Sequence, residues 1–365
     1  MSLNHIFISL FLVSISLHSY SQNKDSIALR KHFDYYLTQS NCYKNLEFLS
    51  TKIESRLSGS PGAAKAVTWA KKAMYEAGAD TVYLQPCMVP HWVRGEKETC
   101  TSINSKTKKQ TSYNICALGN SVGTSKTGLN APVIIVNSYA QLDSLGEKNI
   151  KGKIVFYNVY FDHKHLSTGT CYGETVTYRY SGPSKAAKYG AVATIVRSMS
   201  SINNDFPHTG VMGYDTVLTK NRIPACAISF SGADKLLEEL KANPAMTLQL
   251  KMNCQMLAKE LSYNVVGEIK GSEKPNEIIM AGGHLDAWDN GQGAHDDGAG
   301  VVQAMEVLAM YKKQNIKPKH TIRAVAFMNE ENGGACGKTY FKKAKKNNLK
   351  HIAALESDAG GFSPR

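Results

Sequence analysis

The chain has 365 residues, of which 42% are apolar and 20% are charged, and its formal net charge is +13. This composition excludes a collagen-like, low-complexity or disordered chain, because such chains lack the apolar surface that must offset the entropy lost on folding. A chain of this length buries roughly three quarters of its unfolded surface, so we expect a large core in one or two domains.

Residues 1–21 predict a signal peptide. An uncharged run from Ile6 to Leu17 precedes Ser19, Tyr20 and Ser21, which match the small-residue pattern of a cleavage site. Neither this run nor any later one reaches the ~20 apolar residues of a membrane helix, so no membrane span is expected. A buried N-terminal helix is the alternative, because the segment contains no Lys or Arg. The signal peptide predicts a secreted or periplasmic protein.

Export would place the eight cysteines in an oxidising compartment, where disulfides persist. No two of them form a Cys-x-x-Cys pair, which disfavours a zinc ribbon. Cys226 and Cys254 lie in apolar, strand-like surroundings, where a buried free thiol is equally compatible with the sequence. The sequence therefore leaves disulfides and free thiols open.

Two helices are expected near the start of the chain. Apolar residues recur at helical spacing over residues 46–57, and a second helix follows with Ser60 as its N-cap and Pro61 in its first turn. Gly78 is expected to end this second helix. Residues 81–85 and 87–93 then predict two short strands, the second at a sheet edge because it is flanked and interrupted by prolines.

Residues 123–254 predict an inserted β-rich module. Its expected strands cover residues 132–136, 153–157, 191–196 and 223–230, and its expected helices cover residues 184–189 and 233–240. The module contains no cluster of metal ligands, and His208 stands alone in a loop. We therefore do not expect the functional site in this part of the chain.

Strands and helices alternate after residue 261. Strands are expected at 263–269, 277–282, 321–328 and 351–355, and helices at 300–312 and 338–346. The alternation predicts an α/β fold with a mostly parallel central sheet and helices on both faces. In such sheets, ligands bind at the carboxyl ends of the strands. The dense lysines of residues 338–350 are more typical of a solvated helix face than of a nucleic-acid patch, so no nucleic-acid partner is expected.

Histidine and acidic residues follow these expected strands or lie just before the expected helix at 300–312. They form four clusters: His284 with Asp286, Asp296 with Asp297, Glu330 with Glu331, and Glu356 with Asp358. Carboxylates crowded at one sheet edge repel one another unless protons or cations neutralise them. Histidine with carboxylates suits Zn²⁺ better than Ca²⁺, and a bridging carboxylate would allow two ions about 3.5–4 Å apart. Four independent helix caps and solvated turns are the alternative.

Four motifs lie in order along the chain, at residues 56–60, 90–96, 283–294 and 356–360. This ordered set resembles the secreted co-catalytic zinc exopeptidases of the plasma glutamate carboxypeptidase, or carboxypeptidase Q, type. The resemblance covers nearly the whole mature chain, and residues 123–254 resemble the protease-associated domain of that family. The domains expected are a signal peptide (1–21), an N-terminal part of the peptidase domain (22–122), the protease-associated insert (123–254) and the metal-binding part (255–365).

The resemblance also implies a set of zinc ligands. His284, Asp296 and Asp358 would hold one zinc ion, and Asp296 would bridge to a second zinc ion that Glu331 also holds. The family supplies a last histidine to the second ion from a segment well beyond Asp358, whereas this sequence stops at Arg365. We therefore expect a truncated enzyme with a weakly occupied second site and low or no activity.

Two further roles follow from the resemblance. Glu330 would be the general base that takes a proton from the attacking water and passes it to the departing amine. Asp286 would fix the tautomer and orientation of His284. A surface acid without a catalytic role is the alternative interpretation of Glu330.

The sequence thus predicts a zinc-dependent exopeptidase that hydrolyses short peptides or dipeptides. Whether it reads the amino or the carboxyl end of a peptide is left open. The alternatives are a non-catalytic peptidase-like binding protein, and a zinc amidohydrolase or glutaminyl-cyclase-like enzyme. A peptide substrate is the expected partner, and a homodimer is the one protein partner left open.

Overall fold

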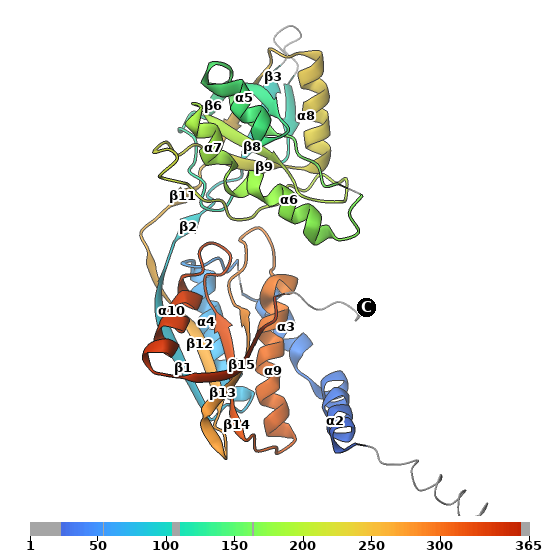
Figure 1. The fold of residues 1–365 in the computed structure, drawn as a ribbon, viewed down its shortest axis with the longest axis vertical. Helices are drawn as coiled ribbons and strands as arrows, with labels where there is room; N and C mark the ends of the chain where they lie inside the picture. Colours follow the sequence, from blue (N-terminus) through green and yellow to red (C-terminus); the bar gives the residue numbers. More distant parts are fainter. Residues whose placement is uncertain (1–22, 54, 104–109, 163, 359–365) are drawn as a thin grey trace, which may run out of the picture.

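The computed structural model describes residues 23–53, 55–103, 110–162 and 164–358, which form two lobes joined by two extended segments (Figure 1). A five-stranded sheet lies in the lower lobe and an eight-stranded sheet in the upper lobe. The predicted signal peptide, residues 1–21, lies outside the described residues. Within the described part of the chain, no helix has the length and apolar character needed to cross a membrane.

Three helices begin the described chain: α2 (Lys24–Gln39), α3 (Cys42–Thr51) and α4 (Pro61–Glu76). The start of α4 confirms the predicted cap, because the Ser60 hydroxyl accepts a hydrogen bond of 3.1 Å from the backbone N–H of Ala63. Pro61 fits the first turn, where a helix needs no N–H. Gly78 follows the end of α4 with φ +89°, a conformation that glycine adopts without steric cost.

The sheet of the lower lobe has the strand order β1-β12-β14-β13-β15. Its strands are β1 (Thr81–Val89), β12 (Glu260–Ile269), β13 (Lys274–His284), β14 (His320–Phe327) and β15 (Lys350–Glu356). The prediction of a mostly parallel sheet is confirmed in part: β13 pairs in parallel with β14 and β15, whereas β12 pairs antiparallel with β1 and β14 and therefore runs against the other four strands. The reason is that β1 leads to the upper lobe and β12 returns from it, so the two run in opposite directions (Figure 1).

Residues 81–89 form one strand where two short strands were predicted. β1 continues through Pro86, which lies opposite Tyr263 in the antiparallel pair with β12. Its position at the edge of the sheet agrees with the prolines, since one side of an edge strand needs no backbone donors. The chain then pairs β2 (Trp92–Val93) with β11 (Gln255–Met256) between the lobes.

Helices cover both faces of the lower sheet. Val265 and Ala324 pack in the core formed with α4 and with α9 (Ala299–Lys313). Their neighbours Val266 and Val325 face the other way and pack with Tyr340 of α10 (Ala335–Lys346). This alternation follows from the two-residue period of a strand.

One disulfide, between Cys87 of β1 and Cys336 of α10, joins residues 249 positions apart in the sequence. The other six cysteines are free thiols, and Cys226 and Cys254 are both buried. Burial raises the pKa of Cys254 to about 11, which keeps its thiol protonated at neutral pH. Both states that the sequence left open, disulfides and free thiols, therefore occur in this chain.

The upper lobe holds an eight-stranded sheet in the order β4-β3-β10-β6-β7-β8-β9-β5. Its strands are β3 (Thr99–Ile103), β4 (Gln110–Tyr113), β5 (Ile115–Ala117), β6 (Leu129–Val136), β7 (Ile154–Tyr157), β8 (Ala193–Arg197), β9 (Ala225–Ile228) and β10 (Thr247–Lys251). Its helices are α5 (Tyr139–Ile150), α6 (Thr168–Tyr180), α7 (Gly182–Lys188) and α8 (Phe230–Ala242). Strands β6 to β9 run parallel, and β3, β4 and β5 join the sheet from before residue 123.

Candidate metal centre

The predicted zinc ligands gather at the carboxyl edge of the lower sheet. β13 ends at His284, the loop after β14 carries Glu330 and Glu331, and Asp358 follows β15. Because these three strands are parallel, their carboxyl ends meet at one edge. Asp296 reaches the same edge from the short segment η1 (Ala294–Gly298), whose backbone is not helical at Asp296 and which leads directly into α9.

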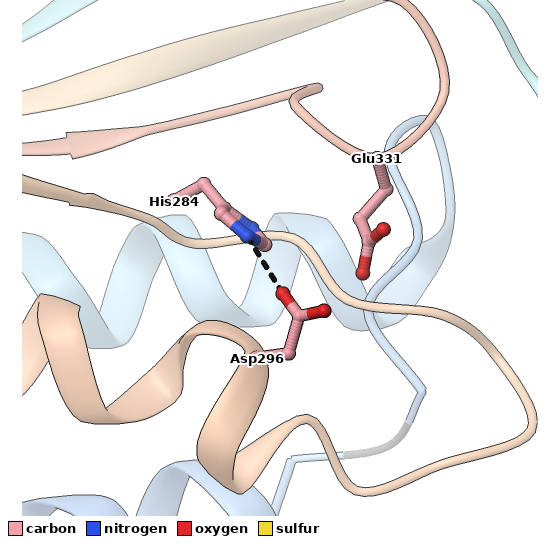
Figure 2. Close-up of side chains that lie close together, drawn as sticks. All are labelled: His284, Asp296 and Glu331. Carbon is pink, nitrogen blue, oxygen red and sulfur yellow. Dashed lines mark ion pairs between the residues drawn. The ribbon is translucent and has the colours of Figure 1, made fainter. Parts of the chain in front are cut away.

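The side chains of this edge point toward one another. The Nε2 atom of His284 lies 2.9 Å from Oδ1 of Asp296 and 3.3 Å from Oδ1 of Asp358. His284, Asp296 and Glu331 each offer a ligand atom, and these atoms all lie within 4.8 Å of one another (Figure 2). A second group with the same spacing contains His284, Asp297 and Asp358. The four sequence-predicted ligands therefore meet at one place.

One wall of the site is buried and the other faces solvent. The side chain of His284 is 1% exposed, whereas those of Asp296 and Asp358 are 62% and 54% exposed. Glu331 is partly buried, and Glu330 beside it is exposed. A ligand can therefore approach the carboxylates from solvent while His284 stays fixed in the protein interior.

The orientation of His284 is set by the backbone of Asp286. Nδ1 of His284 lies 2.9 Å from the Asp286 carbonyl oxygen, which can only accept, so Nδ1 carries the proton and Nε2 faces the carboxylates. The carboxylate of Asp286 is 4.0 Å from Nδ1 and is fully buried. It accepts the backbone N–H groups of Glu330 at 3.0 Å and Glu331 at 3.3 Å. Asp286 thus contacts both the histidine and the glutamate loop.

Sequence reasoning assigned no ligand or positioning role to Asp297, whose side chain is fully buried at the same edge. Its Oδ2 accepts the backbone N–H of His284 at 2.8 Å, and its Oδ1 accepts that of Gly300 at 3.0 Å. Asp297 therefore joins the end of β13 to the start of α9. The signal in the sequence is the pair of acids before a helix, of which a cap needs only one.

The loop after β14 is held by a buried polar network. Asn329 has φ +69°, a left-handed conformation that turns the chain at the strand end. Its side-chain N–H groups donate to Ser58 at 2.9 Å and to Asn332 at 2.6 Å, and the Ser58 hydroxyl donates to Asn332 at 2.8 Å. Sequence reasoning missed these contacts, although Ser58 lies in the motif at residues 56–60.

The pKa values show the crowding of negative charge. Burial, followed by the charges of Asp296 and Asp286, raises the pKa of Glu331 to about 8. Burial alone would lower the pKa of His284, but its hydrogen bond to Asp296 and the nearby carboxylates raise it to about 10. Burial also raises the pKa of Asp297 to about 6. In this state protons carry part of the positive charge that a cation would supply.

The donor set fits a zinc site. One imidazole nitrogen and several carboxylate oxygens are ligands that Zn²⁺ accepts, and the solvent-facing wall leaves a position for water or substrate. His284 also has the backbone partner on its second nitrogen that metal-ligating histidines have.

The part of the chain that contains the site is similar to known peptidases. Residues 264–365, which contain every predicted ligand, match Peptidase family M28. Carboxypeptidase Q of Xenopus laevis is 39% identical over 326 residues, which are 89% of this chain and 66% of that protein. The chain spans about two thirds of the length of the curated relatives it matches.

Solved structures share the fold. The peptidase M28 precursor from Shewanella amazonensis SB2B is 33% identical with a TM-score of 0.84, and the match covers 90% of this chain and 73% of that one. A zinc aminopeptidase from Bacillus subtilis matches at 20% identity and a TM-score of 0.62, covering 86% of this chain and 67% of that one, which shows likeness of fold alone.

The chain therefore belongs to peptidase family M28. Within this family, carboxypeptidase Q resembles the chain along nearly its whole length, at 39% identity for the Xenopus laevis protein and 35% for the Homo sapiens protein.

Proposed function

We propose that this chain forms the metal centre of a zinc-dependent exopeptidase that hydrolyses short peptides or dipeptides. The observation that carries the proposal is the convergence of His284, Asp296 and Glu331, whose ligand atoms lie within 4.8 Å of one another at a sheet edge. Membership of peptidase family M28 supports the same reaction class. The amino or carboxyl direction of attack stays open.

The contacts of His284 support the division of the ligands between two zinc ions. His284, Asp296 and Asp358 would hold the first ion, because Nε2 of the histidine already lies beside an oxygen of each acid. Asp296 would bridge to the second ion, because its carboxylate also lies within 4.8 Å of that of Glu331. Asp297 is a weaker candidate, since both of its oxygens already accept backbone N–H groups.

When bound, zinc lowers the pKa of a water molecule and polarises the scissile carbonyl. Glu330 would take the proton of the attacking water and deliver it to the departing amine nitrogen. Its exposure at the open wall, next to Glu331, supports this role. Although the residue as a whole is exposed, partial desolvation of its carboxylate and the neighbouring acids raise the pKa of Glu330, which makes the carboxylate a stronger base.

Two features outside the site support the remaining expectations. The disulfide between Cys87 and Cys336 is typical of an oxidising compartment and supports export of the chain. The separate sheet of the upper lobe supports the proposal that residues 123–254 belong to a protease-associated module. A homodimer stays a prediction.

The proposal is tested with the protein expressed to the natural stop codon of its gene. Metal analysis should find bound zinc, and a panel of dipeptides should include substrates whose hydrolysis stops with a chelator and returns with added Zn²⁺. Hydrolysis that is indifferent to the chelator, in a protein that contains no zinc, would contradict the proposal.

A further inference from the structure

Arg56 belongs to a motif to which the proposed reaction gives no role. Its side chain is only 2% exposed, and it is among the largest fully buried side chains of the described chain. The guanidinium group donates three hydrogen bonds to backbone carbonyl oxygens. These are Nε to Leu285 at 2.7 Å, Nη1 to Gln292 at 2.7 Å and Nη2 to Gly293 at 2.5 Å.

These carbonyl groups lie at the two ends of one connecting segment, residues 285–293. The segment starts directly after His284 and ends at the turn that carries Asp296, so its conformation decides whether the two ligands meet. A loop that is free to move would lose entropy when its ends come together, and the fork of Arg56 holds both ends in advance. Sequence distance hides this contact, because Arg56 lies 229 residues before Leu285.

The close approach at Gly293 supports a built contact. Gly293 has φ +57°, and a Cβ atom there would lie 2.3 Å from the Cβ atom of Ala287 and 2.6 Å from Nη2 of Arg56. A larger residue would therefore push the segment away from the guanidinium. Glycine lets the backbone fold directly against it.

The charge of Arg56 has no direct counter-ion. Among the residues described, no carboxylate lies within ion-pair distance of its guanidinium, and the acids that act on its charge from further away are Asp286, Glu331, Asp297 and Asp296. A buried charge without a paired acid is costly. Because those acids are the crowded carboxylates of the metal centre, the charge of Arg56 offsets their mutual repulsion before a cation binds.

We propose that Arg56 is a positioning residue of the metal centre, which holds residues 285–293 so that Asp296 meets His284 and which balances part of the carboxylate charge. This inference rests on the proposed zinc site. It predicts that zinc affinity depends on Arg56 although the side chain lies outside the ligand group.

Arg197 offers a matched control in the upper lobe. Its side chain is buried as well, with 1% exposed, and its guanidinium donates to the side chain of Asn158 at 2.8 Å, to the carbonyl oxygen of Phe230 at 3.2 Å and to the hydroxyl of Tyr160 at 2.8 Å. Arg197 also forms an ion pair of 2.8 Å with Asp234, so its charge is balanced locally. Loss of either arginine should destabilise the fold, but only loss of Arg56 should alter the metal centre.

The test compares Arg56→Met, Arg56→Lys and Arg197→Met with the unchanged protein. Zinc dissociation constants are measured by competition with a chromogenic chelator, and the visible absorption of bound Co²⁺ reports the ligand geometry. Arg56→Met should weaken zinc binding by about 10- to 100-fold, as expected for a residue that orients metal ligands, and should alter the Co²⁺ spectrum. Arg56→Lys keeps the positive charge but not the forked guanidinium, so its zinc affinity should lie between those of the unchanged protein and Arg56→Met. Arg197→Met should leave both readouts unchanged.

The outcomes separate this inference from the proposed function. Absence of zinc binding in the unchanged protein would defeat the metal centre itself, and the role of Arg56 with it. Zinc binding of equal strength in the unchanged protein and in folded Arg56→Met would overturn the inference alone. If Arg56→Met does not fold, Arg56→Lys decides, because an unchanged zinc affinity and Co²⁺ spectrum in that variant would contradict the positioning role. An equal loss of zinc affinity in Arg197→Met would also contradict it.

Discussion

Carboxylates in the two lobes are stabilised in opposite ways. In the upper lobe, Glu239 accepts hydrogen bonds from the hydroxyl groups of Tyr113 at 2.8 Å and Ser102 at 2.9 Å. Burial would raise the pKa of Glu239, but these donors lower it overall. At the edge of the lower sheet, burial and neighbouring acids instead raise the pKa of Glu331 to about 8.

The difference shows what distinguishes a candidate metal site from carboxylates that have only a structural role. Asp205 in the upper lobe is also surrounded by donors, since it accepts from Ser229 at 2.6 Å and from Asn114 at 2.6 Å. Such carboxylates are satisfied by the protein itself. The carboxylates around His284 instead face one another, and Arg56 offsets only part of their charge, so full balance needs a proton or a cation.

Replacement of His284 should have the largest effect on zinc binding and hydrolysis. His284→Ala removes the residue common to both groups of possible ligands, so bound zinc and peptide hydrolysis should both fall to background. Metal analysis of the purified variant checks the first effect, and a dipeptide assay checks the second. His208→Ala, a loop histidine of the upper lobe, should retain both; zinc retention in His284→Ala would count against the assignment.

Glu330→Gln should separate zinc binding from catalysis. The substitution removes the proposed proton acceptor, which should lower turnover by about 10²- to 10⁴-fold, while the ligand atoms at the site are unchanged. Steady-state kinetics and zinc content measured on one preparation check this. Glu238→Gln makes the same chemical change on an exposed part of α8 and should have no effect. Normal turnover of Glu330→Gln would remove the base assignment.

Zinc should stabilise the lower lobe by neutralising its carboxylates. At a free zinc concentration 100 times the dissociation constant, the free energy of unfolding should rise by about 2.7 kcal/mol. Thermal or urea unfolding with and without zinc measures this change. His284→Ala should abolish the stabilisation, and an equal effect of zinc on that variant would place the binding elsewhere.

Glu239→Gln, in the upper lobe, should have the smallest effect. Loss of a satisfied carboxylate should cost about 1 kcal/mol of unfolding free energy, because its hydrogen bonds from Tyr113 and Ser102 weaken. Zinc content and turnover should not change. Urea unfolding and metal analysis of this variant give both numbers, and a loss of zinc would show that the two lobes are not independent in this respect.

Local patterns in the sequence predicted the parts of the site that depend on neighbouring residues. The cap at Ser60 is confirmed, because capping needs only a few adjacent positions. His284, Glu331 and Asp358 were expected to meet because they follow parallel strands, and the structure brings them to one edge. Strand ends in such a sheet converge whatever the details of packing.

Contacts between distant segments could not be predicted in the same way. The antiparallel pairing of β1 with β12 joins residues on either side of the upper lobe, and no local pattern encodes it. The bonds from Arg56 to the carbonyls of residues 285–293 and the disulfide between Cys87 and Cys336 also join distant segments. Every residue has a backbone carbonyl, so the sequence does not indicate which carbonyls a buried arginine contacts. Only the three-dimensional structure shows these hydrogen bonds.

The position of bound zinc in a crystal structure decides whether the predicted ligands form a metal centre. Crystals of the protein grown with zinc should show anomalous scattering at the zinc absorption edge next to Nε2 of His284 and the carboxylate of Asp296, at bonding distances of about 2.0–2.2 Å. Crystals soaked in zinc that show no anomalous peak at this edge of the sheet, with Asp296 and Glu331 turned toward solvent, would contradict the account.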